Sequence, residues 1–187
     1  MARISLQPVL QNELILLQPL QQSDFERLYE VASDPLIWEQ HPNKDRYKRE
    51  VFQTYFEGAL ESKGALLLID KLTGEVAGSS RFYDYNEEDS SLLIGYTFIA
   101  RKFWGKAYNP AMKALMIDHA FQYVDKILFH IGANNVRSQI AIGRVGAVKQ
   151  KELSVAYHGE PEKLNFEYLL EKEKWLLHKT TNATSVS

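Results

Sequence analysis

The sequence predicts an α/β or α+β fold, with one mixed central sheet of about six to seven strands flanked by about four helices. Two observations predict it: the hydrophobic periodicity alternates between helical and extended, and the elements follow a definite order. Helices come first, then antiparallel strands, then a strand–helix–strand–helix unit and a final hairpin. With 187 residues, 45% of them hydrophobic, the chain is long enough for one domain with a buried core.

The N-terminal part is expected to contain one strand and two helices. Residues 13–20 form the strand, and Gln21–Asp24 begins a helix that Asp34-Pro35 closes. A second helix covers residues 45–62 and ends at Lys63-Gly64, since glycine readily follows the last helical turn.

Strands follow in quick succession. Residues 65–70 and 76–83 are expected to pair across a turn at 72–75, and residues 86–89 form a polar loop. Residues 92–99 are largely apolar, which is typical of a strand covered on both faces.

The C-terminal half alternates strands and helices. Its expected elements are a loop at 100–108, helices at 110–124 and 136–145, and strands at 126–131, 151–158 and 165–170. Residues 1–178 are expected to form a single domain, followed by a polar tail at 179–187.

Composition excludes several classes of function. A net charge of -2 argues against a nucleic-acid-binding protein, which usually has a strong basic excess. The chain has no cysteine, so disulfides, thiolate nucleophiles and Cys-ligated zinc are excluded, and no metal is expected. We find no signal peptide and no membrane-spanning run, which predicts a cytoplasmic protein without a membrane partner.

Residues 101–110 have the properties of a phosphate-binding loop. They follow a buried strand and open a helix, with Asn109 suited to the N-cap and Pro110 to the first turn. Free N–H groups and the positive end of the dipole favour phosphate there, and Gly105 and Ala107 allow close approach. Positive charge comes from Arg101, Lys102 and Lys106. A basic, capped connection without a ligand has the same features, and the loop matches neither Walker A nor G-x-G-x-x-G.

A second helix start lies at residues 134–147. Asn135 suits the N-cap and Gly146 the left-handed residue after the last turn. Capping accounts for both residues, but it does not account for Ser138.

Five stretches carry a resemblance to a known family: Ser91-Leu92-Leu93-Ile94-Gly95-Tyr96, Trp104-Gly105-Lys106-Ala107-Tyr108-Asn109, Ala120-Phe121, Asn135-Val136-Arg137-Ser138-Gln139-Ile140-Ala141 and Gly146-Ala147. In this order and at this separation they resemble the GCN5-related N-acetyltransferase (GNAT) superfamily, and within it the ribosomal-protein N-terminal (RimJ/RimL-like) branch. The likeness covers roughly residues 10–176. It implies the acyl-CoA N-acyltransferase fold, with acetyl-CoA and an amine acceptor as partners, and a monomer or homodimer.

The resemblance also implies site residues. One strand splays from its parallel neighbour, and the pantetheine arm of the cofactor lies in the opening. The implied pantetheine partners are Phe98, Ile99 and Ala100, and the implied pyrophosphate loop is Phe103, Trp104, Gly105, Lys106, Ala107, Tyr108 and Asn109. Asn135 is implied as a hydrogen-bond partner of the cofactor. Ser138 is implied near the thioester sulfur, where it can protonate the departing thiolate while a backbone N–H stabilises the oxyanion.

Five positions depart from the family pattern. Leu93 and Ala111 stand where relatives often have glutamate, and the glutamate at the first of these is the commonest general base. Ala107 replaces a second glycine, and Lys163-Leu164 stands where Arg-Asp is expected. The cofactor loop is therefore better preserved than the positions that handle protons.

No general base can be assigned from the sequence. Tyr83, Asp84 and Tyr85 end a strand and are possible substitutes, although solvated loop residues have the same pattern. His119 and His130 are interpreted as structural. Trp38 and Tyr47, which could line an acceptor cleft, are interpreted as core residues.

Three functions stay open at this point. The first is acetyl-CoA-dependent N-acetylation of a protein N-terminus or small amine, by direct attack in a ternary complex. The second is a non-catalytic acyl-CoA-binding or regulatory protein, which Leu93 and Ala111 keep open. The third, nucleic-acid or ribosome binding, has only the basic cluster of the loop behind it.

Overall fold

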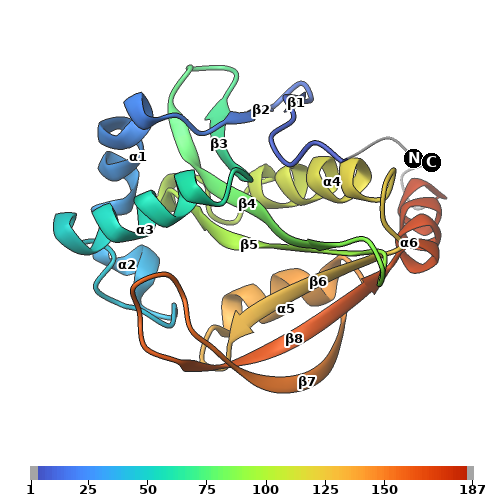
Figure 1. Ribbon diagram of the computed structural model, residues 1–187. Helices are drawn as coiled ribbons and strands as arrows, with labels where there is room; N and C mark the ends of the chain where they lie inside the picture. The colour runs from blue at the N-terminus through green and yellow to red at the C-terminus, as the bar shows by residue number, and fades with distance from the viewer. Residues whose placement is uncertain (1–3, 185–187) are drawn as a thin grey trace.

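The computed structural model describes residues 4–184, which form one twisted mixed sheet with helices on both faces (Figure 1). The eight strands lie in the order β1-β2-β3-β4-β5-β6-β8-β7. Their bounds are β1 Leu10–Gln11, β2 Ile15–Pro19, β3 Ala65–Asp70, β4 Val76–Asn86, β5 Ser91–Ile99, β6 Lys126–Gly132, β7 Val148–Val155 and β8 Lys163–Glu171. The helices are α1 Phe25–Ala32, α2 Pro35–Trp38, α3 Arg49–Glu61, α4 Tyr108–Ala120, α5 Val136–Arg144 and α6 Lys172–Thr184, with single 3-10 turns η1 Gln22–Asp24 and η2 Arg101–Phe103.

The predicted fold class is confirmed, and most elements lie where the periodicity placed them. The differences are one more strand than expected, the two-residue β1, and two more helices, α2 and α6. Helix α6 includes residues 179–184 of the predicted tail; residues 185–187 lie outside the described part of the chain. These elements are too short or too polar to produce an amphipathic pattern, so the sequence gives no signal for them.

Two hydrophobic clusters hold the layers together. One joins the sheet to α4, α5 and α6 and includes Met116, Phe129 and Trp175. The other joins the opposite face to α1, α2 and α3 and includes Trp38 and Phe52, both fully buried. The interpretation of Trp38 as a core residue is therefore confirmed.

One strand pair differs from all the others. Every neighbouring pair is antiparallel except β5 and β6, which are parallel. These two strands pair only over Ser91–Leu93 and Lys126–Leu128. Beyond Leu93 they separate, and β6, β8 and β7 turn away from the rest of the sheet (Figure 1).

Phe52 anchors the cluster beneath α3. Its ring is fully buried and packs against those of Phe25, Tyr29 and Phe98. We expect Phe52→Ala to lower the free energy of unfolding by about 3–5 kcal/mol, because it leaves a cavity in a packed core. Denaturant unfolding measures this, with Leu72→Ala at an 89% exposed site as the control. Similar small losses in both variants would contradict it.

Candidate active site

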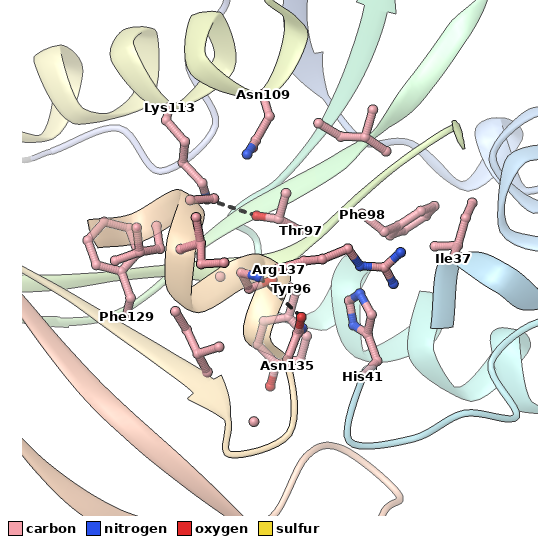
Figure 2. Close-up of a pocket in the computed structure, with 18 of the residues that line it drawn as sticks. Ile37, His41, Tyr96, Thr97, Phe98, Asn109, Lys113, Phe129, Asn135 and Arg137 are labelled. Carbon is pink, nitrogen blue, oxygen red and sulfur yellow. Dashed lines mark hydrogen bonds between the residues drawn. The ribbon is translucent and has the colours of Figure 1, made fainter. Parts of the chain in front are cut away.

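A cleft opens where β5 and β6 separate. Its volume is about 450 Å³, and its walls come from residues 94–99 of β5, residues 129–132 of β6, the start of α4 and helix α5 (Figure 2). The parting of two parallel strands exposes backbone groups that a neighbouring strand would otherwise satisfy. An extended ligand can therefore lie between them as an additional strand.

A β-bulge lies beside this opening. Ser79 pairs with Phe98 and Arg81 with Gly95, so one residue of β4 faces both Tyr96 and Thr97 of β5. Tyr96 takes a left-handed φ of 53°, and its carbonyl oxygen accepts a 2.6 Å hydrogen bond from the Tyr55 hydroxyl. The strand thus bends at the edge of the cleft, and this conformation is fixed by tertiary contacts.

The predicted phosphate loop lies at the mouth of the cleft, but its helix begins earlier than expected. Ala107 is the N-cap of α4, and Tyr108 is its first residue, so the prediction of Asn109 as N-cap is wrong. Proline lacks an N–H that would be free in the first turn anyway, so Pro110 fits as the third residue of the helix. The Asn109 side chain is therefore free to face the cleft, and its Oδ1 is buried without a hydrogen-bond partner in the described structure (Figure 2).

Helix α5 begins as predicted. The Asn135 side chain accepts a 3.2 Å hydrogen bond from the backbone N–H of Ser138, and Gly146 has a φ of 91° after the last turn. Ser138 lines the cleft, and its hydroxyl forms no hydrogen bond with the described residues. The capping hydrogen bond fixes the Asn135 side chain, whereas the Ser138 hydroxyl is available to a ligand in the cleft.

The structure brings most of the implied cofactor residues together. Those that line the cleft are Phe98, Ile99, Phe103, Trp104, Gly105, Lys106, Asn109, Asn135 and Ser138. Ala100, Ala107 and Tyr108 are not among them. The Ala100 N–H instead donates to the Ala77 carbonyl oxygen in β4 (2.8 Å), and the buried Tyr108 hydroxyl donates to Asp70 Oδ1 (3.0 Å).

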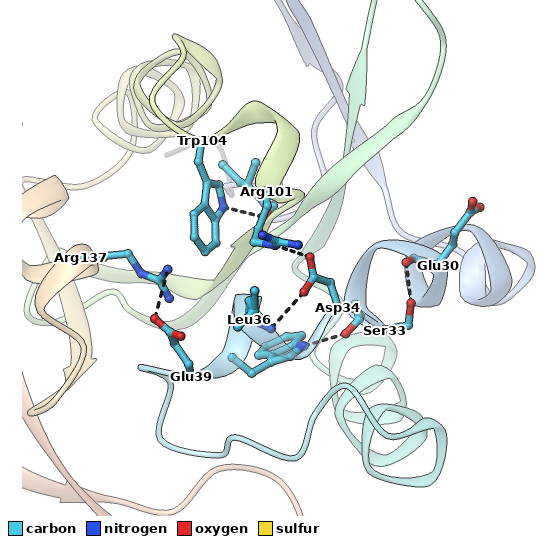
Figure 3. A network of polar contacts seen from close by, with 11 residues as sticks. Glu30, Ser33, Asp34, Leu36, Glu39, Arg101, Trp104 and Arg137 are labelled. Carbon is cyan, nitrogen blue, oxygen red and sulfur yellow. Dashed lines mark hydrogen bonds and ion pairs between the residues drawn. The ribbon is translucent and has the colours of Figure 1, made fainter.

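Polar contacts fasten the loop to α2 and α5 (Figure 3). The Arg137 guanidinium lies over the Trp104 ring at 4.2 Å and 3.9 Å from a Glu39 carboxylate oxygen. The Trp104 indole N–H donates to the Ile99 carbonyl oxygen (2.8 Å), and Arg101 pairs with Asp34. One of the implied pantetheine partners, the Ile99 carbonyl, therefore already accepts a hydrogen bond.

The other end of the cleft is built around a buried ion pair. Arg46 binds Glu160 through two hydrogen bonds of 2.8 and 2.9 Å, and its guanidinium lies over the rings of Tyr55 and Tyr157. Burial, with Arg46 and Arg137 nearby, lowers the pKa of His41 to about 3, so this ring is neutral at physiological pH. Sequence analysis missed this group, because Arg46 and Glu160 are 114 residues apart.

None of the carboxylate or tyrosine substitutes proposed for the general base lines the cleft. Tyr83 is half-buried, and burial of its hydroxyl raises its pKa well above the usual value, while Asp84 and Tyr85 are exposed. Leu93 is buried opposite Leu128. The cleft-lining residues include no Asp or Glu in the described part of the chain.

The two histidines interpreted as structural differ in position. His119 Nε2 lies 2.8 Å from the Ser5 carbonyl oxygen, away from the cleft. His130 does line the cleft, and its Nε2 lies 2.9 Å from Glu167 Oε2 on the adjacent strand. Alternation with apolar residues on a strand could not distinguish these surroundings.

Lys113 is a second cleft residue that the sequence did not single out. It lies on the second turn of α4, only 6% of its surface is exposed, and its Nζ donates to Thr97 Oγ1 at 3.0 Å (Figure 2). Burial lowers the pKa of Lys113 to about 7. Because Lys113 lies between apolar helix positions, periodicity gave no reason to place it in a site.

Other kinds of site find no support. Within residues 4–184, no three His, Cys, Asp or Glu side chains gather closely enough to hold a metal ion. None of the helices described has the length and hydropathy that a membrane span requires.

Comparison with known proteins identifies the fold. The sequence matches the family described as acetyltransferase (GNAT) domain over residues 15–148. A GCN5-related N-acetyltransferase from Brucella melitensis superposes with a TM-score of 0.81 at 15% identity, over 97% of this chain and 86% of that one. An acetyltransferase of the GNAT family from Bacillus anthracis gives 0.66 at 16% identity, over 89% and 99%. Mycobacterium smegmatis RimJ, in complex with CoA-disulfide, gives 0.66 at 17% identity, over 89% and 87%. No curated protein sequence matches the chain.

The Arg46–Glu160 pair generates a prediction on stability. We expect Glu160→Ala to lower the free energy of unfolding by about 3–5 kcal/mol, because it leaves the buried guanidinium without its carboxylate. Chemical denaturation measures the change, and Glu162→Ala, at an exposed position of the same loop, is the matched control. If both variants were equally stable, the pair would not hold this end of the cleft together.

Proposed function

Because the chain belongs to the GNAT acetyltransferase family, we propose that it transfers the acetyl group of acetyl-CoA to the primary amine of a protein N-terminus or a small molecule. The family assignment makes it an acetyl-CoA-dependent acyltransferase, in agreement with the resemblance seen in the sequence. The observation that carries the proposal is the opening between β5 and β6, where Asn109, Asn135 and Ser138 line one cleft. We place the reaction in the cytoplasm, since a sequence without cysteine is compatible with a reducing compartment.

The pyrophosphate of the donor is assigned to the turn between η2 and α4. The first N–H groups of a helix are free to bind anions, and Gly105 has a φ of 69° with open space on the side where any other residue would carry its Cβ. Lys106 and Arg137 line the cleft nearby and supply positive charge. The RimJ neighbour with the same fold is in complex with CoA-disulfide, which supports coenzyme A as the ligand.

The pantetheine arm is assigned to the cleft-facing edge of β5. Successive residues of a strand direct their backbone groups to opposite edges. Since the Ala100 N–H points to β4, the backbone groups of Ile99 and Thr97 face the opening. The Ile99 carbonyl oxygen already accepts from the Trp104 indole, so its N–H is the group assigned to the donor. This replaces the implied set of Phe98, Ile99 and Ala100 and directs the thioester toward the bulge and Ser138.

The reaction then needs no covalent enzyme intermediate. The neutral amine attacks the thioester carbonyl carbon, a C–N bond forms and the C–S bond breaks. The proton that the nitrogen loses balances the one that the sulfur gains, and the Ser138 hydroxyl can donate to the sulfur and be reprotonated by solvent. The acceptor enters from the end of the cleft built by Arg46 and Tyr157. A chain without cysteine cannot form an acyl-thiol intermediate, which supports direct attack in a ternary complex.

One observation favours a second function, acyl-CoA binding without catalysis. Leu93 is buried where relatives often have a glutamate, and no cleft-lining carboxylate among the described residues replaces it. An α-amine has a pKa near 8 and needs less help to lose its proton than a lysine side chain near 10.4. Catalysis therefore remains the better proposal for α-amine acceptors.

Two measurements test the function. Calorimetry should detect acetyl-CoA binding with a dissociation constant of about 1 µM–1 mM, the usual range for such substrates. Release of the CoA thiol, followed with a chromogenic disulfide, should depend on an added amine or N-terminal peptide. Lack of binding would contradict both functions, whereas binding without thiol release on any acceptor would favour the second.

The assignment of Ser138 is tested separately. We expect Ser138→Ala to lower kcat by about 10²-fold, because it removes a proton donor to the leaving sulfur, with a much smaller effect on acetyl-CoA affinity. Ser154→Ala, at an exposed position on β7, is the control. Equal losses in kcat and affinity would assign Ser138 to binding instead.

A further inference from the structure

Lys113 is an unusual residue to find inside the cleft. Lysine is rarely buried unless an anion accompanies it, because removing an ammonium from water is costly. Lys113 is 6% exposed, and no carboxylate forms an ion pair with it within the described chain. The function proposed above does not use this group, so its position requires a separate explanation.

The Lys113 side chain extends over the opening between the two strands. Its Nζ donates to Thr97 Oγ1 on β5 at 3.0 Å and lies 5.6 Å from the ring centre of Phe129 on β6. Thr97 and Phe129 lie beyond the Leu93–Leu128 pair, where β5 and β6 have separated (Figure 2). The pantetheine arm of acetyl-CoA, in the position proposed above, therefore passes next to Lys113 Nζ.

A short hydrogen-bond chain fixes the direction of Nζ. The hydroxyls of Thr97 and Ser80 lie 2.8 Å apart, and that of Ser80 is 3.4 Å from the Gly95 carbonyl oxygen. Thr97 belongs to the β-bulge, beside the backbone groups assigned to the thioester end of the donor. An ammonium has three N–H donors, so at least one stays available after the bond to Thr97.

We propose that Lys113 is a catalytic residue whose Nζ donates a hydrogen bond to the thioester carbonyl oxygen of the bound donor. This rests on the proposed function. When the amine nitrogen attacks the carbonyl carbon, the C=O π electrons move to the oxygen, and Lys113 stabilises the resulting oxyanion together with the backbone. When the C–S bond breaks, those electrons return to re-form the carbonyl and the thiolate leaves. Lys113 ends the cycle with the protons it began with.

Among the described residues, no carboxylate lines the cleft into which Lys113 extends. The other charged and titratable residues that line the cleft are His41, Arg46, Tyr96, Lys106, His130, Arg137, Arg144 and Tyr157. Burial alone lowers the pKa of Lys113 to about 7, so both protonation states are populated at neutral pH. The charged form is the stronger donor, because hydrogen bonds from an ionised group are roughly twice as strong as neutral ones.

Lys113→Met tests the proposal, since methionine keeps the length of the side chain and removes the donor. We expect kcat at pH 6.5 to fall about 10²-fold, the usual loss for one oxyanion donor, while acetyl-CoA affinity changes less than about 3-fold. Thr97→Val should cause a smaller loss in kcat, because it removes the anchor of Nζ. Lys149→Met, at an exposed site on β7, is the matched control. Unchanged kcat in Lys113→Met would overturn the proposal.

The pH dependence separates a catalytic from a structural role. The ratio of wild-type to Lys113→Met activity cancels the ionisation of the acceptor amine. We expect this ratio to fall as pH rises from 6 to 8.5, because Lys113 loses its charge near pH 7. Lys113→Arg keeps its charge throughout, so its ratio to Lys113→Met should stay flat. A wild-type ratio that does not change with pH would overturn the role of the ammonium.

Thermal stability gives a readout that needs no acceptor. The pKa is lowered on folding, so the charged amine destabilises the fold fully below about pH 7, and this cost is relieved as pH rises toward 10.5. Lys113→Met should therefore raise Tm, and by more at pH 6 than at pH 9. A lower Tm at both pH values would identify Lys113 as a structural residue and overturn the proposal.

The outcomes also separate this proposal from the function on which it rests. If wild-type protein binds no acetyl-CoA, the proposed function fails and the role of Lys113 fails with it. If it binds acetyl-CoA but acetylates no acceptor, the role of Lys113 can still be tested. The slow hydrolysis of the bound thioester by water is then measured in place of acetyl transfer to an amine. Hydrolysis that is equal in wild type and Lys113→Met would overturn the role of Lys113 alone.

Discussion

The parting of β5 and β6 after a short stretch of parallel pairing is the constraint on which the site depends. Two strands that stop exchanging hydrogen bonds leave backbone donors and acceptors that another extended chain can satisfy. The bulge at Tyr96–Thr97 and the early start of α4 both border this opening. Asn109, Lys113 and Ser138 reach the cleft because the helices carrying them cover it.

Much of the fold could be predicted because its helices and strands are long and periodic. Residues 65–70 are a strand with the predicted bounds, and the ends of α5 follow from the capping chemistry of Asn135 and Gly146. Helix α6 could not be predicted, since a polar helix at the end of a chain has the composition of a tail. The start of α4 was misplaced because Asn109 and Pro110 fit a helix start at more than one register.

The candidate site likewise has a part that could be predicted from the sequence and a part that could not. The loop at 101–110 and the start of α5 are local in sequence, so residues that line the cleft could be named in advance, although Ala100, Ala107 and Tyr108 do not line it. The opposite end of the cleft, proposed for the acceptor, depends on contacts between distant segments, such as Arg46 with Glu160. Lys113 could not be found from periodicity either, because both faces of α4 are covered and a buried polar residue leaves no trace in the apolar pattern.

The Arg46–Glu160 pair joins the segment between α2 and α3 to the loop between β7 and β8. Each residue alone is a liability in a buried position, so neither can be exchanged without the other. If the acceptor binds at this end of the cleft, as proposed, homologues that have adapted to other amines should have replaced both positions together. In an alignment of such sequences, coupled changes at these two columns would mark the boundaries between groups with different acceptors.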